Sequence, residues 1–131
     1  MSTAVPAIEV EHLVAGYGTR RILDDVSFTV NTGDIMIIMG GSGSGKSTLL
    51  RNLLGLNRPT SGTIRLLGQD TSRLDADGRI ALQKNIGVSF QGGALLSSMT
   101  IGENVALPLR EHTKLADETI AVMARVKLEV V

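Results

Sequence analysis

The chain has 131 residues, and its 13 basic and 13 acidic side chains give a formal net charge of zero. This balance excludes a dominant attraction to nucleic acid or to an anionic lipid surface, and the absence of cysteine excludes a disulfide framework and thiolate chemistry. No uninterrupted apolar run exceeds five residues, whereas a membrane-spanning helix needs about 20. We therefore expect a cytoplasmic chain with no nucleic-acid partner, which can still dock on a membrane protein.

Two strands joined by a turn are predicted near the N-terminus. Residues 7–14 and 22–30 are rich in apolar and β-branched side chains, and the glycines of residues 16–18 mark the turn between them. Apolar and polar residues alternate from 26 to 30. The second strand is therefore expected to have one wet face.

The next segment changes from strongly apolar to glycine-rich. Residues 35–39 are all apolar and do not alternate, which is typical of a strand buried on both faces. A helix is predicted from about Gly45, because leucines recur at helical spacing from 49 to 54. Gly55 and Pro59 mark its end.

Shorter elements are predicted in the middle of the chain. A short strand is predicted at 63–67, after the Ser61-Gly62 pair, and residues 86–90 are an apolar strand candidate. Residues 76–85 favour a short helix. The polar stretch at 70–77 is expected to be exposed.

Two helices are predicted in the last third of the chain. The first covers residues 103–107 and is expected to stop at Pro108. The second begins near Ala116, and its predicted apolar face consists of Ile120, Met123, Val126 and Val130. The helical pattern continues to the last residue, Val131, without a cap, so we expect the chain to be truncated.

The clearest motif lies between the predicted buried strand and the predicted helix. Gly40, four further residues, Gly45, Lys46 and Ser47 match the phosphate-binding loop pattern Gly-x-x-x-x-Gly-Lys-Ser/Thr. Glycines let the backbone approach phosphate oxygens with its N–H groups, and a helix N-terminus adds its positive dipole end. Lys46 is expected to reach the β- and γ-phosphates, and the Ser47 hydroxyl to bind Mg²⁺.

A glycine–serine segment that joins a strand to a helix without a ligand is the alternative interpretation. We favour phosphate binding because the motif has the strand before it and the helix after it that this chemistry requires. The residues predicted to bind the phosphates are Gly40, Gly41, Ser42, Gly43, Ser44, Gly45, Lys46, Ser47 and Thr48.

Two isolated residues carry weaker signals. Tyr17, the only tyrosine, is either a packed aromatic of a small sheet or a ring that stacks on a base. Gln91 follows the predicted strand at 86–90, and it is either an ordinary loop residue or a ligand that binds Mg²⁺ or positions water.

Three features in this order carry a family resemblance. Tyr17, the run GGSGSGKST at 40–48 and the run VSFQ at 88–91 together resemble the ATP-binding subunit of ABC transporters, over essentially the whole chain. The implied fold is an incomplete α/β P-loop NTPase of the ABC ATPase type. It comprises an N-terminal antiparallel β part, the first portion of a RecA-like core and the start of the helical subdomain.

The resemblance implies roles and cofactors. Tyr17 resembles the adenine-stacking aromatic, residues 40–47 resemble the Walker A loop, and Gln91 resembles the glutamine that contacts Mg²⁺ and couples the site to a transmembrane partner. ATP and Mg²⁺ are the implied cofactors, with Ser47 and Gln91 as metal ligands. The implied partners are a transmembrane permease and a second copy of the ATPase subunit. In the resembled family ATP is sandwiched between the two ATPase copies.

A longer run narrows the resemblance to a subgroup. The sequence QGGALLSSMTIGENVALPLREHT at 91–113 is similar to the Mla-type, or toluene-tolerance, ATPases of Gram-negative bacteria. These drive phospholipid transport across the cell envelope, which implies lipid-binding partners and a peripheral location on the inner membrane. An ATPase of a different ABC importer or exporter is the alternative.

The family's hydrolytic residues are expected downstream of residue 131. The signature motif, the Walker B aspartate, the catalytic glutamate and the switch histidine are absent, so residues 1–131 are expected to form the N-terminal portion of one ATP-binding domain, without catalytic residues. The full-length protein is expected to be an ATPase, and the chain as given a nucleotide-binding fragment without turnover. In the resembled fold both sheet neighbours of residues 35–39 also lie downstream.

Another kind of P-loop enzyme is a further alternative, but small kinases usually begin almost at the loop.

Overall fold

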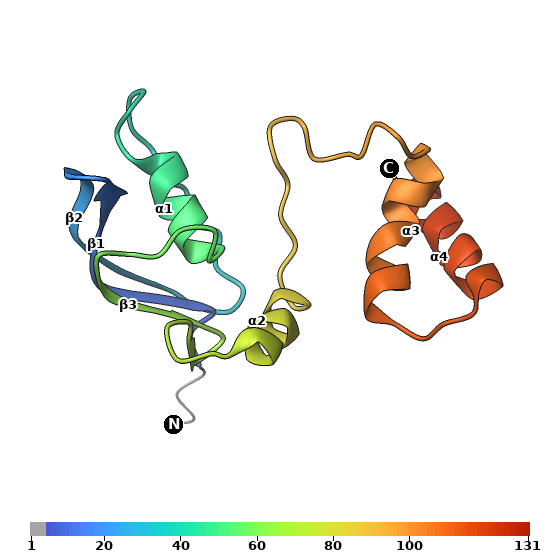
Figure 1. The fold of residues 1–131 in the computed structure, drawn as a ribbon, viewed down its shortest axis with the longest axis horizontal. Helices are drawn as coiled ribbons and strands as arrows, with labels where there is room; N and C mark the ends of the chain where they lie inside the picture. The colour runs from blue at the N-terminus through green and yellow to red at the C-terminus, as the bar shows by residue number, and fades with distance from the viewer. Residues whose placement is uncertain (1–4) are drawn as a thin grey trace. The chain divides into compact units, whose positions relative to one another are not determined.

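A computed structural model describes residues 5–131 of the chain (Figure 1). The described elements are β1 (Ile8–Tyr17), β2 (Arg20–Val30), α1 (Lys46–Leu53), β3 (Ser61–Leu66), β4 (Gln69–Asp70), α2 (Ala76–Gln83), α3 (Ile101–His112) and α4 (Asp117–Glu129). They fall into two compact units, an N-terminal unit, Met1–Leu82, and a C-terminal unit, Gln83–Val131.

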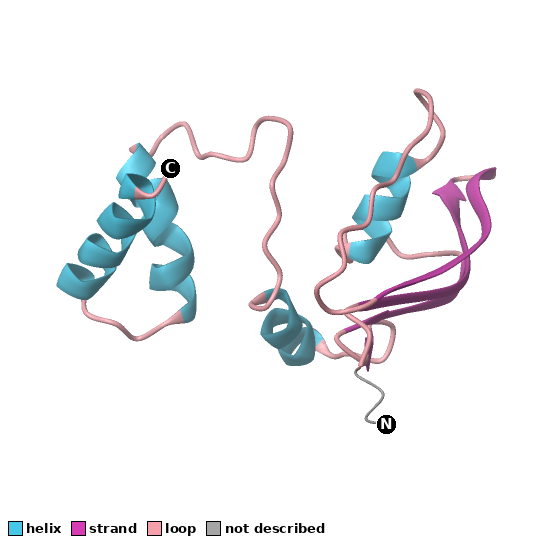
Figure 2. Cartoon of the chain, turned by 180° about the vertical axis from the view of Figure 1, so that it is seen from behind, coloured by secondary structure: helices cyan, strands magenta, loops and turns pink. Residues whose placement is uncertain are grey.

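An antiparallel sheet dominates the N-terminal unit, with the strand order β2-β1-β3-β4 (Figure 2). Strands β1 and β2 form a hairpin in which Tyr17 pairs with Arg20 across a two-residue turn. The first residue of this turn, Gly18, has a φ of 55°, and hairpin turns of this length favour glycine at such a position. The strands predicted at 7–14, 22–30 and 63–67 are therefore confirmed.

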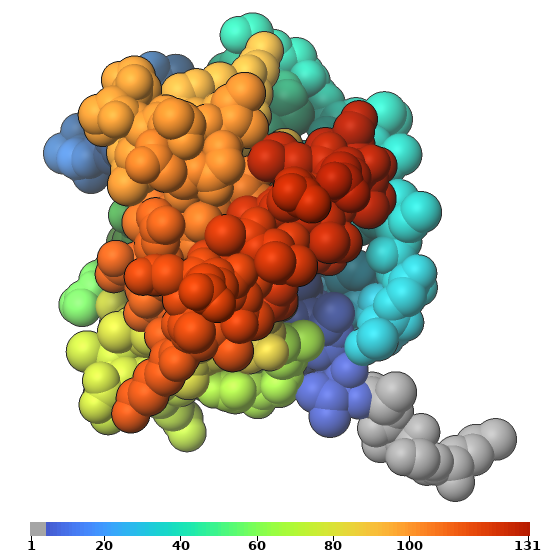
Figure 3. Space-filling model, turned by 90° about the vertical axis from the view of Figure 1, so that its right-hand side faces the viewer, coloured from blue at the N-terminus to red at the C-terminus, as the bar shows by residue number. Residues whose placement is uncertain are grey.

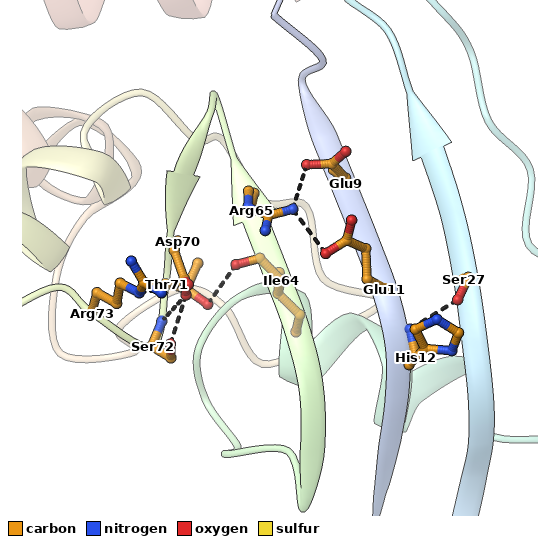
Figure 4. Close-up of polar contacts among 10 residues, drawn as sticks. All are labelled: Glu9, Glu11, His12, Ser27, Ile64, Arg65, Asp70, Thr71, Ser72 and Arg73. Carbon is orange, nitrogen blue, oxygen red and sulfur yellow. Dashed lines mark hydrogen bonds and ion pairs between the residues drawn. The ribbon is translucent and has the colours of Figure 1, made fainter.

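A β-bulge in β1 determines which of its side chains are buried. The β1–β2 register shifts between Val10 and Leu13, where His12 adopts a φ of 49°. The extra residue resets the alternation, so Val10 and Leu13 are both buried although they lie three positions apart. The N–H of His12 donates to Ser27 Oγ at 2.8 Å, which satisfies a donor at the bulge (Figure 4).

The core of the N-terminal unit lies between the sheet and α1, which contacts β1 and β2. Its buried apolar side chains are Val10, Leu13, Ala15, Leu23, Val30, Leu49, Leu53, Ile64 and Leu66. A charged cluster stabilises the β1–β3 pairing: the Arg65 guanidinium donates to Glu9 at 2.8 Å and to Glu11 at 2.9 Å (Figure 4). Thus apolar burial holds α1 to the sheet, and ion pairing supports the register of its central strands.

The predicted strands at 35–39 and 86–90 do not form in the described chain. The side chains at 35–39 are between 39% and 93% exposed, and Val88 and Phe90 are also exposed. A strand requires a neighbour to accept and donate its backbone hydrogen bonds, and residues 5–131 supply none for either segment. The predictions of a buried strand at 35–39 and of a strand at 86–90 were therefore wrong for this chain.

The helix predicted from about Gly45 is confirmed as α1, and the short helix predicted at 76–85 is confirmed as α2. The helix predicted at 103–107 is longer than expected, because α3 begins at Ile101 and continues through Pro108 to His112. Proline inside a helix removes one hydrogen bond. The helix continues because Val105 and Leu109, on either side of Pro108, pack against the core of the C-terminal unit.

That core joins α3 and α4, which run side by side within the C-terminal unit (Figure 3). Its buried residues are Ala106, Ile120 and Ala124. The predicted apolar face of the last helix was therefore only partly correct, since Met123, Val126 and Val130 are exposed. None of the four described helices has the length and apolar character that crossing a bilayer requires.

Candidate functional site

The glycine-rich loop at 40–45 leads directly into α1, and the side chain of Lys46 bonds back to the loop backbone. The Nζ of Lys46 donates to the carbonyl oxygens of Gly40 at 2.6 Å and Gly41 at 2.7 Å. A third, longer contact of 3.4 Å reaches Ser44 Oγ. These bonds curve the loop around the lysine side chain, so a positive charge and the loop backbone share one exposed site.

Gly45 holds the end of this loop against the sheet. Its φ is 98°, and an added Cβ would lie 2.8 Å from Leu23 Cδ2 and 3.1 Å from Ile22 Cγ2. A side chain at this position would be strained by its backbone conformation and crowded by β2. The glycine therefore lets α1 start directly over the hairpin.

The N-terminus of α1 is open. Gly45 provides no side-chain cap, and the first turn contains no acidic residue. The first N–H groups of a helix have no partner within the helix, and together with the helix dipole they attract anions. Ser47 is exposed in the same turn, with its hydroxyl available as a hard oxygen ligand. The arrangement fits a polyphosphate, with Lys46 as the neutralising cation.

The protein side chains of the site offer few ligands for a metal ion. Among residues 5–131, no group of three or more His, Cys, Asp or Glu side chains is placed to hold a metal. Magnesium in phosphate-binding sites commonly takes one or two protein ligands together with phosphate oxygens and water. Ser47 fits this pattern, because its exposed hydroxyl lies one residue after the loop lysine.

The structure brings Tyr17 to the same helix. Tyr17 ends β1, and the hairpin is so tight there that a Cβ on Gly16 would lie 2.0 Å from the Arg20 carbonyl oxygen. The Tyr17 hydroxyl accepts a hydrogen bond from Asn57 Nδ2 at 3.3 Å. Hydrogen bonds to the Thr48 side chain, and then to Asn57, hold the pKa of Tyr17 below its ordinary value. The ring remains 49% exposed.

Thr48 lies buried in the first turn of α1, and its carbonyl accepts a hydrogen bond from Asn52 Nδ2 at 2.8 Å. Its predicted contact with phosphate stays a prediction. Asn57 was missed altogether, because it lies 40 positions from its partner and belongs to no recognised pattern.

Gln91 lies in the C-terminal unit, in an exposed segment before α3. Its predicted contact with the phosphate site stays a prediction. The later part of this segment is shaped by Asn104, whose Oδ1 accepts from the Leu96 N–H at 2.7 Å and whose Nδ2 donates to the Leu96 carbonyl at 3.1 Å. The sequence carried one unused signal here, since Thr100 and Glu103 match the helix-capping pattern Thr-x-x-Glu.

Comparison with known proteins gives a consistent result. Residues 23–131 match the sequence model of a family described as ABC transporter. A probable ribonucleotide transport ATP-binding protein of Mycobacterium leprae is 40% identical over 125 residues, which cover 95% of this chain and 36% of that protein. The ATP-binding protein MlaF of an intermembrane phospholipid transport system, from Haemophilus influenzae, is 41% identical over 124 residues, or 95% of this chain and 47% of that protein.

A solved structure supports the fold. A dimeric ATP-binding cassette in a post-hydrolysis state, bound to ADP and Pi, has a TM-score of 0.81 and 29% sequence identity to this chain. The match covers 93% of this chain and 56% of that one. The chain thus spans about a third to a half of the length of the two curated relatives.

Proposed function

Because the chain belongs to the ABC transporter family as an ATP-binding component, we propose that the loop at 40–48 binds the triphosphate of Mg-ATP. The predicted fold class, an incomplete P-loop NTPase of the ABC ATPase type, is confirmed by the likeness to a solved ATP-binding cassette. The observation that carries the proposal is the Lys46 side chain bound to the Gly40 and Gly41 carbonyls beside an uncapped helix N-terminus.

Each residue of the site has a proposed role. The loop N–H groups and the first turn of α1 bind phosphate oxygens, and Lys46 exchanges its carbonyl contacts for the β- and γ-phosphates. Ser47 ligates Mg²⁺, and Gln91 is proposed as a second metal ligand. When bound, Mg²⁺ neutralises negative charge that develops on the phosphates. Tyr17 presents its exposed ring to the adenine.

We further propose that the full-length protein hydrolyses ATP between two copies of the subunit and drives phospholipid transport. Two observations support this substrate: the run at 91–113 and the relative named for intermembrane phospholipid transport. The proposed partners are a transmembrane permease and lipid-binding components. The proposed location is the cytoplasmic face of the inner membrane.

A different transported substrate is the second candidate, because another relative is named as a probable ribonucleotide transport protein. The two are separated by reconstituting the full-length transporter in vesicles with ATP. Phospholipid transport predicts ATP-dependent transfer of a fluorescent phospholipid between membranes. Uptake of a labelled ribonucleotide without lipid transfer would instead support the second candidate.

The proposed ATP site is tested with Lys46→Ala in the full-length protein. Charge-assisted hydrogen bonds each contribute about 1.5–3 kcal/mol, so we expect the ATP affinity to fall by about 10- to 100-fold. Lys127→Ala, on the exposed surface of α4, is the matched control and should bind ATP normally. Isothermal titration calorimetry with ATP and Mg²⁺ measures both, and equal affinities would contradict the proposal.

A further inference from the structure

The hydroxyl group of Tyr17 has a partner that base stacking does not require. A phenylalanine ring would supply the same aromatic face, yet the structure gives the tyrosine hydroxyl a hydrogen bond from Asn57 at 3.3 Å. The two residues come from two segments, the end of β1 and the loop after α1. The hydroxyl therefore links the hairpin to the segment that follows the helix.

The backbone around Asn57 is held to α1. Leu56 and Asn57 both donate their N–H groups to the Arg51 carbonyl, at 2.9 and 3.2 Å. Gly55, with a φ of 70°, donates to the Asn52 carbonyl at 3.1 Å and lets the chain reverse at the helix end. These bonds fix the backbone from which the Asn57 side chain reaches Tyr17.

Helix α1 joins this donor to the phosphate-binding groups. Asn57 is bonded through its N–H to Arg51 in the last turn of α1, and the first turn of the same helix carries Lys46 and Ser47. The bond from Asn57 thus ties the ring to the element that carries the phosphate-binding groups.

We propose that Asn57 is a positioning residue, which holds the exposed ring of Tyr17 at a set place relative to the 40–48 loop so that a purine base and its phosphates bind together. The inference rests on the proposed ATP site. A nucleotide fixes the separation between base and phosphates, so a protein that fixes the same separation beforehand loses less conformational freedom on binding. The positioning of Tyr17 therefore strengthens the binding of ligands that contain a base, and it does not affect the binding of phosphate alone.

The test compares ATP with inorganic tripolyphosphate as ligands of the full-length protein. Tyr17→Phe keeps the ring and removes the anchored hydroxyl, and Asn57→Ala removes its donor. Loss of about one neutral hydrogen bond predicts a 3- to 10-fold weaker ATP affinity, roughly, with tripolyphosphate affinity unchanged. The Tyr17→Phe/Asn57→Ala double variant should lose no more than Tyr17→Phe, because both remove the same bond.

Controls separate this inference from the proposed function. Leu56→Ala changes an exposed neighbour in the same turn and should leave both affinities unchanged. Tyr17→Ala and Lys46→Ala test stacking and phosphate binding themselves. If either binds ATP as the wild type does, the proposed function fails and the inference with it.

Two results would overturn the inference alone. In the first, Tyr17→Ala and Lys46→Ala weaken ATP binding while Tyr17→Phe and Asn57→Ala do not, so the hydroxyl has no positioning role. In the second, Tyr17→Phe and Asn57→Ala weaken ATP and tripolyphosphate equally, which indicates a general disturbance of the unit.

Discussion

The first turns of α1 and α3 differ in how their backbone N–H groups are satisfied. At α3, Thr100 Oγ1 accepts from the Glu103 N–H at 3.2 Å, and Glu103 Oε2 accepts from the Thr100 N–H at 2.7 Å. At α1, no side chain caps the helix, and Gly45 precedes it. Unsatisfied helix donors are unfavourable unless water or a ligand binds them. The α3 terminus is thus satisfied within the chain, whereas the α1 terminus leaves donors for the anion that we propose to bind there.

The largest effect on this difference between the two helix termini is expected from Gly45→Ala, which disturbs the uncapped terminus of α1. A non-glycine residue at a φ of 98° is strained, and its Cβ would crowd Leu23. We expect a loss of about 1–3 kcal/mol in the free energy of unfolding and no measurable ATP binding.

Gly102→Ala, in the first turn of α3, is the matched control for this variant. Nothing lies within 4 Å of an added Cβ there, so stability should not fall and ATP affinity should stay near wild type. Urea unfolding and calorimetry on the full-length protein measure both quantities. Equal behaviour of the two variants would show that the start of α1 is not specific to glycine.

The complementary change removes the cap of α3. Thr100→Ala deletes the acceptor of the Glu103 N–H, and the loss of an N-cap lowers the free energy of unfolding by about 1 kcal/mol. ATP affinity should not change, because the cap is a structural feature of the C-terminal unit. Thr100→Ser keeps the hydroxyl and should restore the stability. A weaker ATP affinity in Thr100→Ala, measured by calorimetry, would contradict the assignment of the two termini.

The smallest expected effect is a pH dependence of the same cap. Hydrogen bonds from the Thr100 N–H, and then from its side chain, hold the pKa of Glu103 below its ordinary value of 4.5. A carboxyl group with a lowered pKa stabilises the fold fully above its unfolded pKa, and this contribution is lost as the pH falls through the folded pKa. The wild type should therefore lose stability relative to Glu103→Gln below pH 4.5.

Urea unfolding of both proteins between pH 7 and pH 3 tests this expectation. Glutamine keeps an acceptor in the capping box and does not titrate. Since Glu103 is exposed, the difference is expected to be modest and to shrink at high salt. A constant difference over the whole range would contradict a capping role for the Glu103 carboxylate.

The C-terminal unit shows where local sequence patterns misled. Pro108 was expected to end a helix, but packing of Val105 and Leu109 outweighs its missing donor. The Thr100–Glu103 pattern was present in the sequence, and it places the helix start earlier than the predicted residue 103. On α4, the predicted Ile120 is buried, but its buried neighbour is Ala124, and the predicted Met123, Val126 and Val130 stay exposed.

Whether a predicted strand formed depended on whether it had a neighbouring strand to pair with. Strands β1 and β2 were predictable because they are joined by a tight turn and pair with each other. Residues 35–39 have equally strong strand character, yet a strand forms only when a neighbour completes its hydrogen bonds. Periodicity measures what a segment favours, and it contains no information about whether the partner is present.

The sequence alone predicted the phosphate-binding loop, because the loop, its lysine and the helix after it lie within a few positions and act through local backbone geometry. It also predicted the family to which the chain belongs. Only the tertiary structure decided that Asn57 donates a hydrogen bond to the Tyr17 hydroxyl. That contact joins residues 40 positions apart through the packing of α1 on the hairpin, and long-range packing leaves no periodic trace in the chain.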